Sequence, residues 1–412
     1  MKTLILDDDP TGTQSASGVT VMLRWTAEAI AQELRNADAV YLLTNTRAVS
    51  EDSAVALVRG IVDDARRVEE LIGEPIRFVL RGDSTLRGHV FAESEAAGGS
   101  APILFVPAYP QGGRTTVDGQ HLVRVDGEPV AAERTEFADD PVFGYDNGRL
   151  DEYVREKSAR TPRLLGARIV RDRVAIREEL RRASDGDVLL PDVHDDDDIE
   201  CIAAAVRDIW PEREFVVRSG APLAAAIAEV SSEGMLEAPL ARPDGPVLLV
   251  CGSHTGAAGR QLAEVARIHG EILEVDTEAA LADPQREGRR VAALVRERLE
   301  DAGLAVVSSE RVRRPEHDTL EHGEHVMRAL MTVVADVRRL TGTVISKGGI
   351  TGADVAREGI GADRAAVRGQ VLPGVSVWDL RSADGDVIVQ VVVPGNVGED
   401  DTLVKALRSV GR

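Results

Sequence analysis

One pattern repeats along the whole chain: a short apolar run that ends near Gly, Ser, Thr or Asp, followed by a stretch with helical periodicity. The segment 54–71 is such a stretch, with apolar residues three or four positions apart. This alternation predicts an α/β fold in which largely parallel strands are joined by crossover helices. The expected strands are 3–6, 39–43, 76–80, 103–106, 187–190, 214–217, 247–250, 271–275, 304–307, 343–346 and 387–392.

The segment 237–246 divides the chain, because its three prolines interrupt the alternation just before a new apolar run begins. A chain of 412 residues also exceeds the size at which single hydrophobic cores stop growing. We therefore expect two domains, 1–238 and 239–412, each a largely parallel sheet flanked by helices, with a ligand cleft between them. The stretch 107–148, rich in Gly, Asp and Pro, is expected to be a long and functional surface excursion.

Charge and composition exclude several classes of protein. The chain carries 70 acidic and 49 basic residues, and its net charge of −21 would repel nucleic acid phosphates and anionic lipid. Cys201 and Cys251 are too few for a disulfide framework, and no apolar run approaches the length of a spanning helix. We expect a cytoplasmic protein that binds small molecules, has no nucleic acid or membrane partner, and can form a homodimer.

Three strand-to-helix junctions in the second half have the composition of phosphate-binding loops. They follow apolar runs at 251–256, 346–352 and 393–398, with helices expected from 257, 353 and 401. Small residues let backbone N–H groups approach an anion at which a helix directs its positive dipole end. A single such loop is also typical of a tight turn, but three in one domain favour a nucleotide site. Neither the P-loop pattern nor G-x-G-x-x-G occurs there, so the site is of another kind.

The first half places polar residues after its strands, at 7–14, 44–47 and 81–88. Groups just beyond the carboxyl ends of parallel strands meet in the crevice where open α/β sheets bind ligands. Arg47 and Arg87 can each hold a carboxylate with two hydrogen bonds, and Asp and Asn accept hydrogen bonds from sugar hydroxyls. The loop 111–119 carries an arginine and two threonines between glycines and could close over a ligand. In the alternative interpretation, Ser84 and Thr85 only cap a helix and the early aspartates form a turn.

Five motifs, spread in order over nearly the whole chain, resemble the four-carbon acid sugar kinase family. The resemblance implies a sugar-acid domain followed by a nucleotide domain, and transfer of phosphate from ATP to the terminal hydroxyl of threonate, erythronate or 2-oxo-tetronate. Together the motifs are specific, although none is decisive alone. They are Asp-Asp-x-Thr-Gly at 8–12, Asp-Ser-Thr-Leu-Arg-Gly at 83–88, Gly-Arg-Thr-Thr at 113–116, Ser-Lys-Gly-Gly at 346–349 and Gly-Asn-x-Gly at 395–398.

Together, the residues and the resemblance give a set of candidate site residues. Asp9 or Asp8 is expected to accept the hydroxyl proton or to hold Mg²⁺, and the sequence does not assign which. Ser253, the run Gly348 to Thr351 and Gly395 fall on the family's ATP-binding positions by resemblance. The expected acid-binding residues are Thr11, Gly12, Asn45, Arg47, Asp83, Ser84, Arg87, Arg114 and Thr115, and the expected nucleotide-binding residues are Ser253, Lys347, Gly348, Gly349, Ile350, Thr351, Gly395 and Asn396.

The chain also departs from the family pattern. Many of these kinases have Ala where this chain has Asp7 and Glu where it has Ile350, and His254 replaces a small residue. These departures leave the identity of the acid open. Two alternative functions fit the same residues. One is a hydroxy-acid dehydrogenase, which the missing G-x-G-x-x-G disfavours, and the other is a nucleotide or sugar-acid sensor without catalysis.

Overall fold

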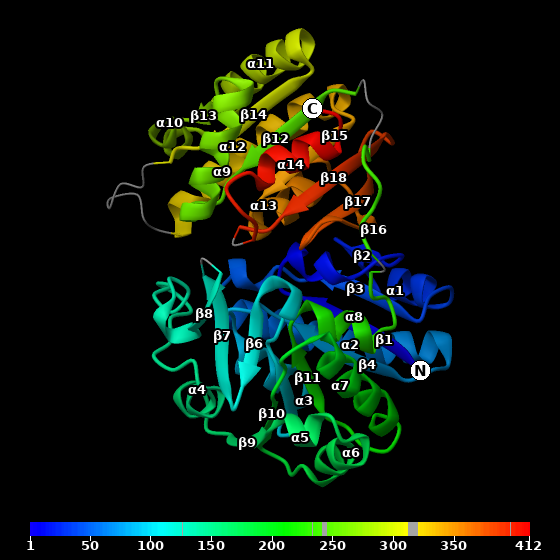
Figure 1. Ribbon diagram of the computed structural model, residues 1–412. Coiled ribbons are helices and arrows are strands. Elements are labelled where there is room, and N and C mark those ends of the chain that lie inside the picture. The colour runs from blue at the N-terminus through cyan, green and yellow to red at the C-terminus, as the bar shows by residue number, and fades with distance from the viewer. Residues whose placement is uncertain (126, 233, 241–244, 312–319, 396) are drawn as a thin grey trace. The chain divides into compact units, whose positions relative to one another are not determined.

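The computed structural model describes residues 1–412 except 126, 233, 241–244, 312–319 and 396 (Figure 1). By its internal contacts the chain divides into two compact units. The N-terminal unit comprises Met1–Val19 and Trp25–Ser232, and the C-terminal unit comprises Thr20–Arg24 and Glu233–Arg412. A short early segment belongs to the second unit because its strand β2 (Thr20–Met22) pairs antiparallel with β16 (Arg364–Leu372).

The N-terminal unit is built on a parallel sheet in the order β3-β1-β4-β11-β5-β10-β9. In its register Asp7 lies opposite both Leu43 and Arg81, and Arg81 lies opposite Ser219. Four neighbouring strands therefore end at the same side of the sheet, and three of them end in the polar residues Asp7, Arg81 and Ser219. The strands are β1 (Lys2–Asp7), β3 (Ala39–Leu43), β4 (Ile76–Arg81), β5 (Ile103–Val106), β9 (Thr161–Leu165), β10 (Asp187–Pro191) and β11 (Val216–Ser219).

The helices of this unit follow from their caps and apolar spacing. In α2 (Glu51–Ile72) the Ser50 hydroxyl accepts a hydrogen bond from the Ser53 N–H, and Gly73 ends the helix in the left-handed region at φ 73°. The acidic run at 195–198 starts a helix, because Asp195 caps α7 by accepting from the Asp198 N–H. The remaining helices are α1 (Ala27–Leu34), α3 (Val90–Gly98), α4 (Leu150–Lys157), α5 (Ala167–Val170), α6 (Arg173–Arg182), α7 (Asp196–Ile209) and α8 (Ala221–Ile227).

The excursion 107–148 is more ordered than the sequence suggested. It contains a three-stranded antiparallel sheet of β6 (Arg114–Val117), β7 (Gln120–Val125) and β8 (Glu128–Ala131), which Figure 1 shows in cyan. A tight turn joins β6 to β7, in which Asp118 and Gly119 both have positive φ. No strands were predicted from the sequence here, although an Asp-Gly turn between short polar strands is a hairpin signal.

The C-terminal unit has a parallel core, β13-β14-β12-β15-β18, extended on one side by the antiparallel strands β17, β16 and β2. In its register Lys347 lies opposite both Cys251 and Val393, so the three predicted junctions follow neighbouring strands. The strands are β12 (Val247–Cys251), β13 (Leu273–Val275), β14 (Leu304–Ser309), β15 (Thr343–Lys347), β17 (Val375–Arg381) and β18 (Val387–Val393).

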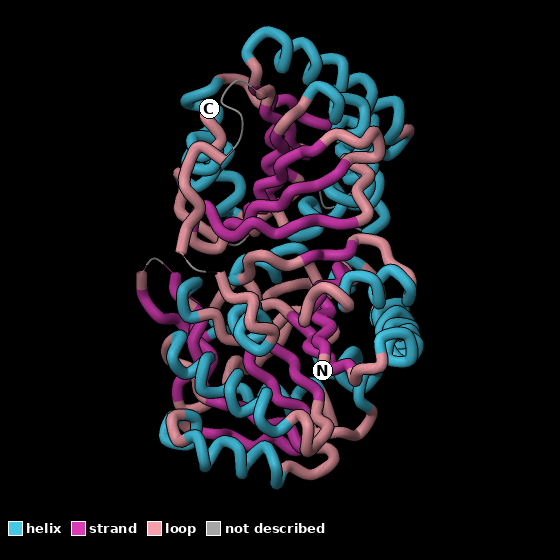
Figure 2. The backbone as a smooth tube through the Cα atoms, turned by 90° about the vertical axis from the view of Figure 1, so that its right-hand side faces the viewer, coloured by secondary structure: helices cyan, strands magenta, loops and turns pink. Residues whose placement is uncertain are grey.

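Figure 2 shows the helices of each unit packed against its strands, which fits the α/β prediction. The second junction was predicted incorrectly: its helix begins at Gly349 rather than at 353, so the paired glycines open a helix. Over the described residues, no helix combines the length and apolar character needed to cross a membrane. The helices of this unit are α9 (Gly256–His269), α10 (Thr277–Ala282), α11 (Pro284–Ala302), α12 (Leu320–Val337), α13 (Gly349–Asp354), the π-helical turn η7 (Val355–Gly359) and α14 (Thr402–Ser409).

Candidate active site

Three consecutive aspartates at the end of β1 surround one buried guanidinium. Arg81, at the end of β4, is 2% exposed. Its Nη1 donates to Asp7 Oδ1 at 3.1 Å, to Asp8 Oδ1 at 3.2 Å and to Asp9 Oδ1 at 3.1 Å. Arg81 was not among the predicted site residues, although it occupies the strand-end position that identified its neighbours. This guanidinium offsets part of a concentrated negative charge.

The predicted residues Asp9, Thr11 and Gly12 form the short 3₁₀ helix η1 (Pro10–Ser15). Asp9 caps it, since its Oδ1 accepts from the Thr11 N–H at 2.7 Å and from the Thr11 hydroxyl. A Cβ on Gly12 would stand 2.1 Å from both Asp7 carboxylate oxygens. Gly12 is therefore required by the close approach of Asp7, which links this motif to the residue that departs from the family.

Arg47 and Arg87, which the sequence predicts in the same acid-binding site, both lie close to Asp83. Arg47 lies in the turn η2 (Thr46–Ala48), with its guanidinium 3.6 Å from Asp8 and Asp83 carboxylate oxygens and in contact with Asp9. Arg87 Nε donates to Asp83 Oδ2 at 2.8 Å. Although burial opposes it, Arg87, Arg47 and the Thr85 hydroxyl hold the pKa of Asp83 well below its usual range.

Two further predicted acid-binding residues lie at the edges of this cluster. Asn45 adopts the left-handed conformation at φ 54°, and its buried Oδ1 has no hydrogen-bond partner among the described residues. Arg114 is buried on β6, where desolvation lowers its pKa and Asp83 acts in the opposite direction. Thr115 is its neighbour along the strand, so its side chain faces the other side of the hairpin and the structure separates the two. Ser84 is buried beside Asp83.

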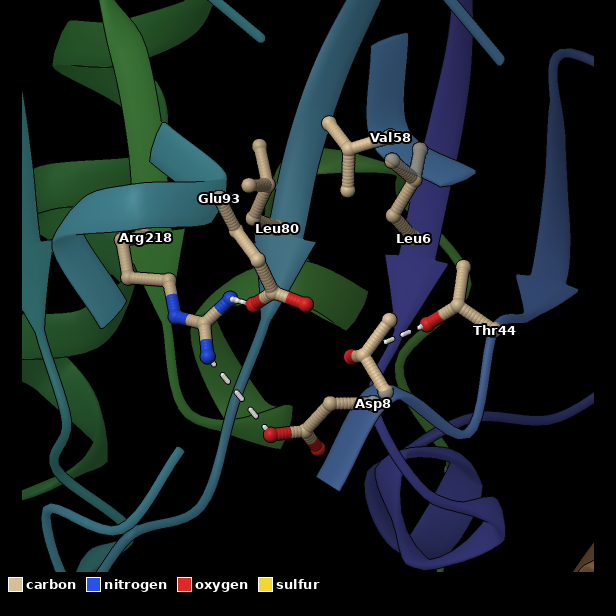
Figure 3. A pocket seen from close by; sticks show the side chains of 8 residues that line it. Leu6, Asp8, Thr44, Val58, Leu80, Glu93 and Arg218 are labelled. Carbon is tan, nitrogen blue, oxygen red and sulfur yellow. Dashed lines mark hydrogen bonds and ion pairs between the residues drawn. The ribbon is translucent and has the colours of Figure 1, made fainter. Parts of the chain in front are cut away.

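A second buried arginine, which sequence reasoning missed, completes the cluster. Arg218 lies at the end of β11 between Glu93 of α3 and Asp8, as Figure 3 shows. Its Nη1 donates to Glu93, and its Nη2 lies 3.6 Å from Asp8 Oδ2. These three side chains form the polar end of a pocket whose apolar walls include Leu6 and Leu80. A polar residue ending an apolar strand was the signal that could have identified Arg218.

Asp7 is the most perturbed carboxyl group in the cluster. Burial raises the pKa of Asp7 to about 7; Arg81 opposes that rise, and the nearby Asp8 adds to it. Its Oδ2 is buried without a hydrogen-bond partner among the described residues. Burial therefore favours the protonated form of Asp7, in a site where a fully charged third aspartate would be costly.

Replacing Asp7 by Asn should change how stability depends on pH. The folded-state pKa lies above the unfolded value of about 3.9, so the wild type loses stability as pH rises from about 4 to 7, by about 4 kcal/mol in total. Asn is neutral at every pH and lacks this loss. Thermal unfolding in metal-free buffer should show the Tm of Asp7→Asn rising relative to wild type between pH 5 and pH 8. An equal Tm difference at both pH values would contradict this.

The C-terminal unit brings its three glycine-bearing junctions together around Ser253. A Cβ on Gly395 would lie 3.0 Å from Ser253 Oγ, and a Cβ on Gly348 would lie 3.1 Å from both Ser253 Cβ and Thr351 Oγ1. The Thr255 hydroxyl, which caps α9, donates to the Gly395 carbonyl at 2.9 Å. Loops from β12, β15 and β18 therefore approach each other closely, and a side chain at either glycine would make a tight contact with Ser253. Among the predicted nucleotide residues, Gly349 opens α13, the Ile350 side chain is exposed, and Asn396 lies outside the described residues.

Lys347 does not extend from β15 toward open space. It is fully buried, and its Nζ donates to the carbonyls of Pro394 at 2.6 Å and Val397 at 3.4 Å. Burial lowers its pKa to about 8. Lys347 thus holds the loop after β18 by its carbonyl groups, and its role in nucleotide binding stays a prediction. Nearby, His254, which stands where the family resemblance implies a small residue, contacts the Ser309 hydroxyl through Nε2 at 3.2 Å.

The carboxylates after β1 also bear on a metal. Across the described residues, no three His, Cys, Asp or Glu side chains form a cluster arranged to hold an ion. Asp8 Oδ2 is nevertheless buried without a hydrogen-bond partner, and carboxylate oxygens are the ligands that Mg²⁺ prefers. The residues present fit an ion held by one or two carboxylates together with phosphate oxygens.

Two family profiles cover most of the chain. One, described as Sugar-binding N-terminal domain, matches residues 3–227, and the other, described as Nucleotide-binding C-terminal domain, matches residues 248–403. A D-threonate kinase of Bordetella bronchiseptica is 28% identical over 425 residues, which cover 98% of this chain and 96% of that protein. A D-threonate kinase of Cupriavidus necator is 28% identical over 290 residues, or 64% of this chain and 63% of that protein.

Solved structures share the fold over the full length. A protein of Salmonella typhimurium LT2 superposes with a TM-score of 0.71 at 18% identity, covering 99% of both chains. A Haemophilus influenzae protein assigned to DUF1537 gives a TM-score of 0.63 at 18% identity, covering 99% of this chain and 100% of the other. With both profiles matched in order, this chain belongs to the four-carbon acid sugar kinase family.

Proposed function

We propose that the protein is an ATP-dependent kinase that phosphorylates the terminal hydroxyl of a four-carbon sugar acid, such as threonate, erythronate or an oxo-tetronate. The observation that carries the proposal is the convergence of three glycine-bearing junctions at Ser253, in a chain whose other unit gathers aspartates and arginines at one sheet edge. The two relatives named D-threonate kinase support the reaction class. The domain 1–238 would bind the acid and 239–412 the nucleotide.

The acid-binding residues can hold a carboxylate and several hydroxyls. Arg87 and Arg47 lie within ion-pair distance of Asp83 and are less buried than Arg81, with side chains 20% and 15% exposed. A sugar-acid carboxylate could share these guanidinium groups, and the spare Oδ1 of Asn45 could accept from a hydroxyl. Binding of this kind holds the terminal hydroxyl in place for attack.

Transfer of the phosphoryl group requires a base and charge neutralisation. The hydroxyl oxygen of the acid bonds to the γ-phosphorus of ATP, the bond from that phosphorus to the β,γ-bridging oxygen breaks, and ADP leaves. Asp9 or Asp8 accepts the hydroxyl proton, and the other would hold Mg²⁺, whose charge would neutralise the phosphates when bound. Homodimerisation is a separate prediction, which size-exclusion chromatography with light scattering would test.

ADP release from Mg-ATP tests the proposal across a panel of threonate and erythronate stereoisomers, their 2-oxo and 3-oxo relatives, and five-carbon acids. We expect ADP release with one four-carbon acid only. We expect no NAD-dependent change in absorbance when the same acids are incubated with NAD in place of ATP. If no acid in the panel gives ADP release and ATP still raises the Tm, the result would instead support the non-catalytic sensor, because ligand binding without turnover raises Tm.

Lys347→Met should weaken nucleotide binding specifically. Met has nearly the same length but cannot donate to the Pro394 and Val397 carbonyls, so the loop after β18 loses its buried anchor. Loss of hydrogen bonds from a charged donor costs about 1.5–3 kcal/mol. We expect the KM for ATP to rise about tenfold or more and the KM for the acid to stay within twofold. Lys405→Met, at an exposed ion pair with Asp401, is the control. An unchanged KM for ATP would contradict the role assigned to Lys347.

A further inference from the structure

Three consecutive backbone carbonyls in the loop after β4 are each held by a buried side chain from a distant segment. His121 Nε2 lies 2.9 Å from the Ser84 carbonyl oxygen. The Tyr145 hydroxyl shares its proton between the Thr85 carbonyl at 3.1 Å and the Ala132 carbonyl at 3.3 Å, and the Tyr153 hydroxyl donates to the Leu86 carbonyl at 2.8 Å. The three donors come from β7, the segment before α4, and α4 itself, and none belongs to a motif recognised in the sequence.

These donors are themselves fixed in place. Burial lowers the pKa of His121 to about 4, so its ring is neutral at physiological pH. A carbonyl only accepts, so Nε2 carries the proton, and Nδ1 accepts from the Thr116 hydroxyl at 3.1 Å. The rings of Tyr145 and Tyr153 pack edge to face, with centroids 5.7 Å apart. The side chains of His121, Tyr145 and Tyr153, which we call the aromatic layer, therefore form a packed, hydrogen-bonded unit behind the loop.

The three bonds determine which way the loop presents its N–H groups. In a planar trans peptide the carbonyl and the following N–H point in opposite directions. Drawing the carbonyls of Ser84, Thr85 and Leu86 into the aromatic layer therefore turns the N–H groups of residues 85–87 away from it. Leu86 also has a left-handed φ of 67°, a backbone conformation that a non-glycine residue rarely adopts. Without its three hydrogen bonds the loop would relax out of this conformation.

Side chains on the same loop already face the candidate acid site. Asp83 and Arg87 flank the three held peptides, and they pair with each other and with Arg47. The Arg87 guanidinium also lies 5.0 Å above the Phe137 ring, which belongs to the same excursion as Tyr145. The excursion 107–148 and α4 thus support this loop from behind.

We infer that His121, Tyr145 and Tyr153 are positioning residues, which hold the backbone of residues 84–87 in the single conformation that receives the anionic substrate. The inference rests on the proposed function for the identity of that substrate. The three side chains do not touch the reacting atoms, and they act only through the loop carbonyls. The excursion therefore contributes to binding of the acid. Loss of the Tyr145 or Tyr153 hydroxyl should weaken acid binding and leave nucleotide binding unchanged.

Tyr145→Phe and Tyr153→Phe test the inference, because each keeps the ring and removes one hydroxyl. Each should raise the KM for the acid about fivefold, the effect of losing one ordinary hydrogen bond, and the double variant should raise it further than either single variant. The KM for ATP should stay within twofold. Tyr41→Phe is the matched control, because its buried hydroxyl has no hydrogen-bond partner among the described residues.

Hydrogen exchange separates this inference from the proposed function. Peptides covering 83–88 should exchange at least tenfold faster in the double variant than in wild type or in Tyr41→Phe, whether or not the protein turns over any acid. Wild-type inactivity across the panel would remove the kinase proposal, and calorimetric titration of the acids would then report the binding role. Unchanged exchange, or equal increases in both KM values, would overturn the inference.

Discussion

Asp9→Asn should lower kcat for the acid by roughly 10²–10⁴-fold, the range expected when a positioned general base is removed. The substitution keeps the size of the side chain. Asn can still accept the 2.7 Å hydrogen bond from the Thr11 N–H, so η1 should remain capped. Asn cannot take a proton or serve as a charged ligand, so either role assigned to Asp9 is lost. Initial rates of ADP formation at saturating acid and ATP would measure the effect.

The control for this variant is Asp63→Asn, which removes a carboxylate from an exposed i,i+3 pair with Arg66. It should leave kcat within twofold of wild type. Asp8→Asn should show whether the neighbouring carboxylate shares the role, since its Oδ2 has no hydrogen-bond partner among the described residues. A wild-type kcat in Asp9→Asn would remove Asp9 from the chemistry.

Arg81→Met should produce the largest loss of stability among these substitutions. Removing this guanidinium leaves Asp7, Asp8 and Asp9 buried with much less compensating charge. Breaking a buried pair by removing one partner typically costs about 3–5 kcal/mol. Met has a similar length and fills much of the same volume, so the loss would report charge rather than a cavity. Urea unfolding, followed by tryptophan fluorescence and circular dichroism, would measure the change in midpoint.

Two comparisons make the result interpretable. Arg66→Met removes an exposed ion pair with Asp63 and should change stability by less than about 1 kcal/mol. Adding Asp7→Asn to Arg81→Met should restore part of the stability, since it removes one of the three carboxylates that Arg81 contacts. If Arg81→Met were as mild as Arg66→Met, the carboxylate cluster would not depend on Arg81 for its stability.

Local sequence patterns predicted much of the sheet. Strands such as β1 and β12 are continuous buried apolar runs, so their positions follow from hydrophobicity alone. The strands that were missed lack this signal. β9 contains Pro162 and lies at the edge of its sheet, and β16 and β17 form an antiparallel hairpin within a unit expected to be parallel.

The candidate site was predictable where chemistry follows a strand end along the chain. Asp8, Asp9, Asp83 and Arg87 were found in this way, and the structure brings them together. Glu93 was not predicted, because it lies within α3. Its partner Arg218 is 125 residues away along the chain, and only the packing of α3 against β11 brings the two together. The role of Lys347 also depends on a distant contact, with the carbonyl of Pro394, which a strand pattern cannot reveal.

Product analysis tests the central claim most directly. The protein is incubated with Mg-ATP and the four-carbon acid that gives the fastest ADP release, and the products are separated and identified by mass spectrometry and phosphorus NMR. The proposal predicts one ADP for each phosphorylated acid, with the phosphate on the terminal carbon. Release of ADP and inorganic phosphate without a phosphorylated acid would contradict it.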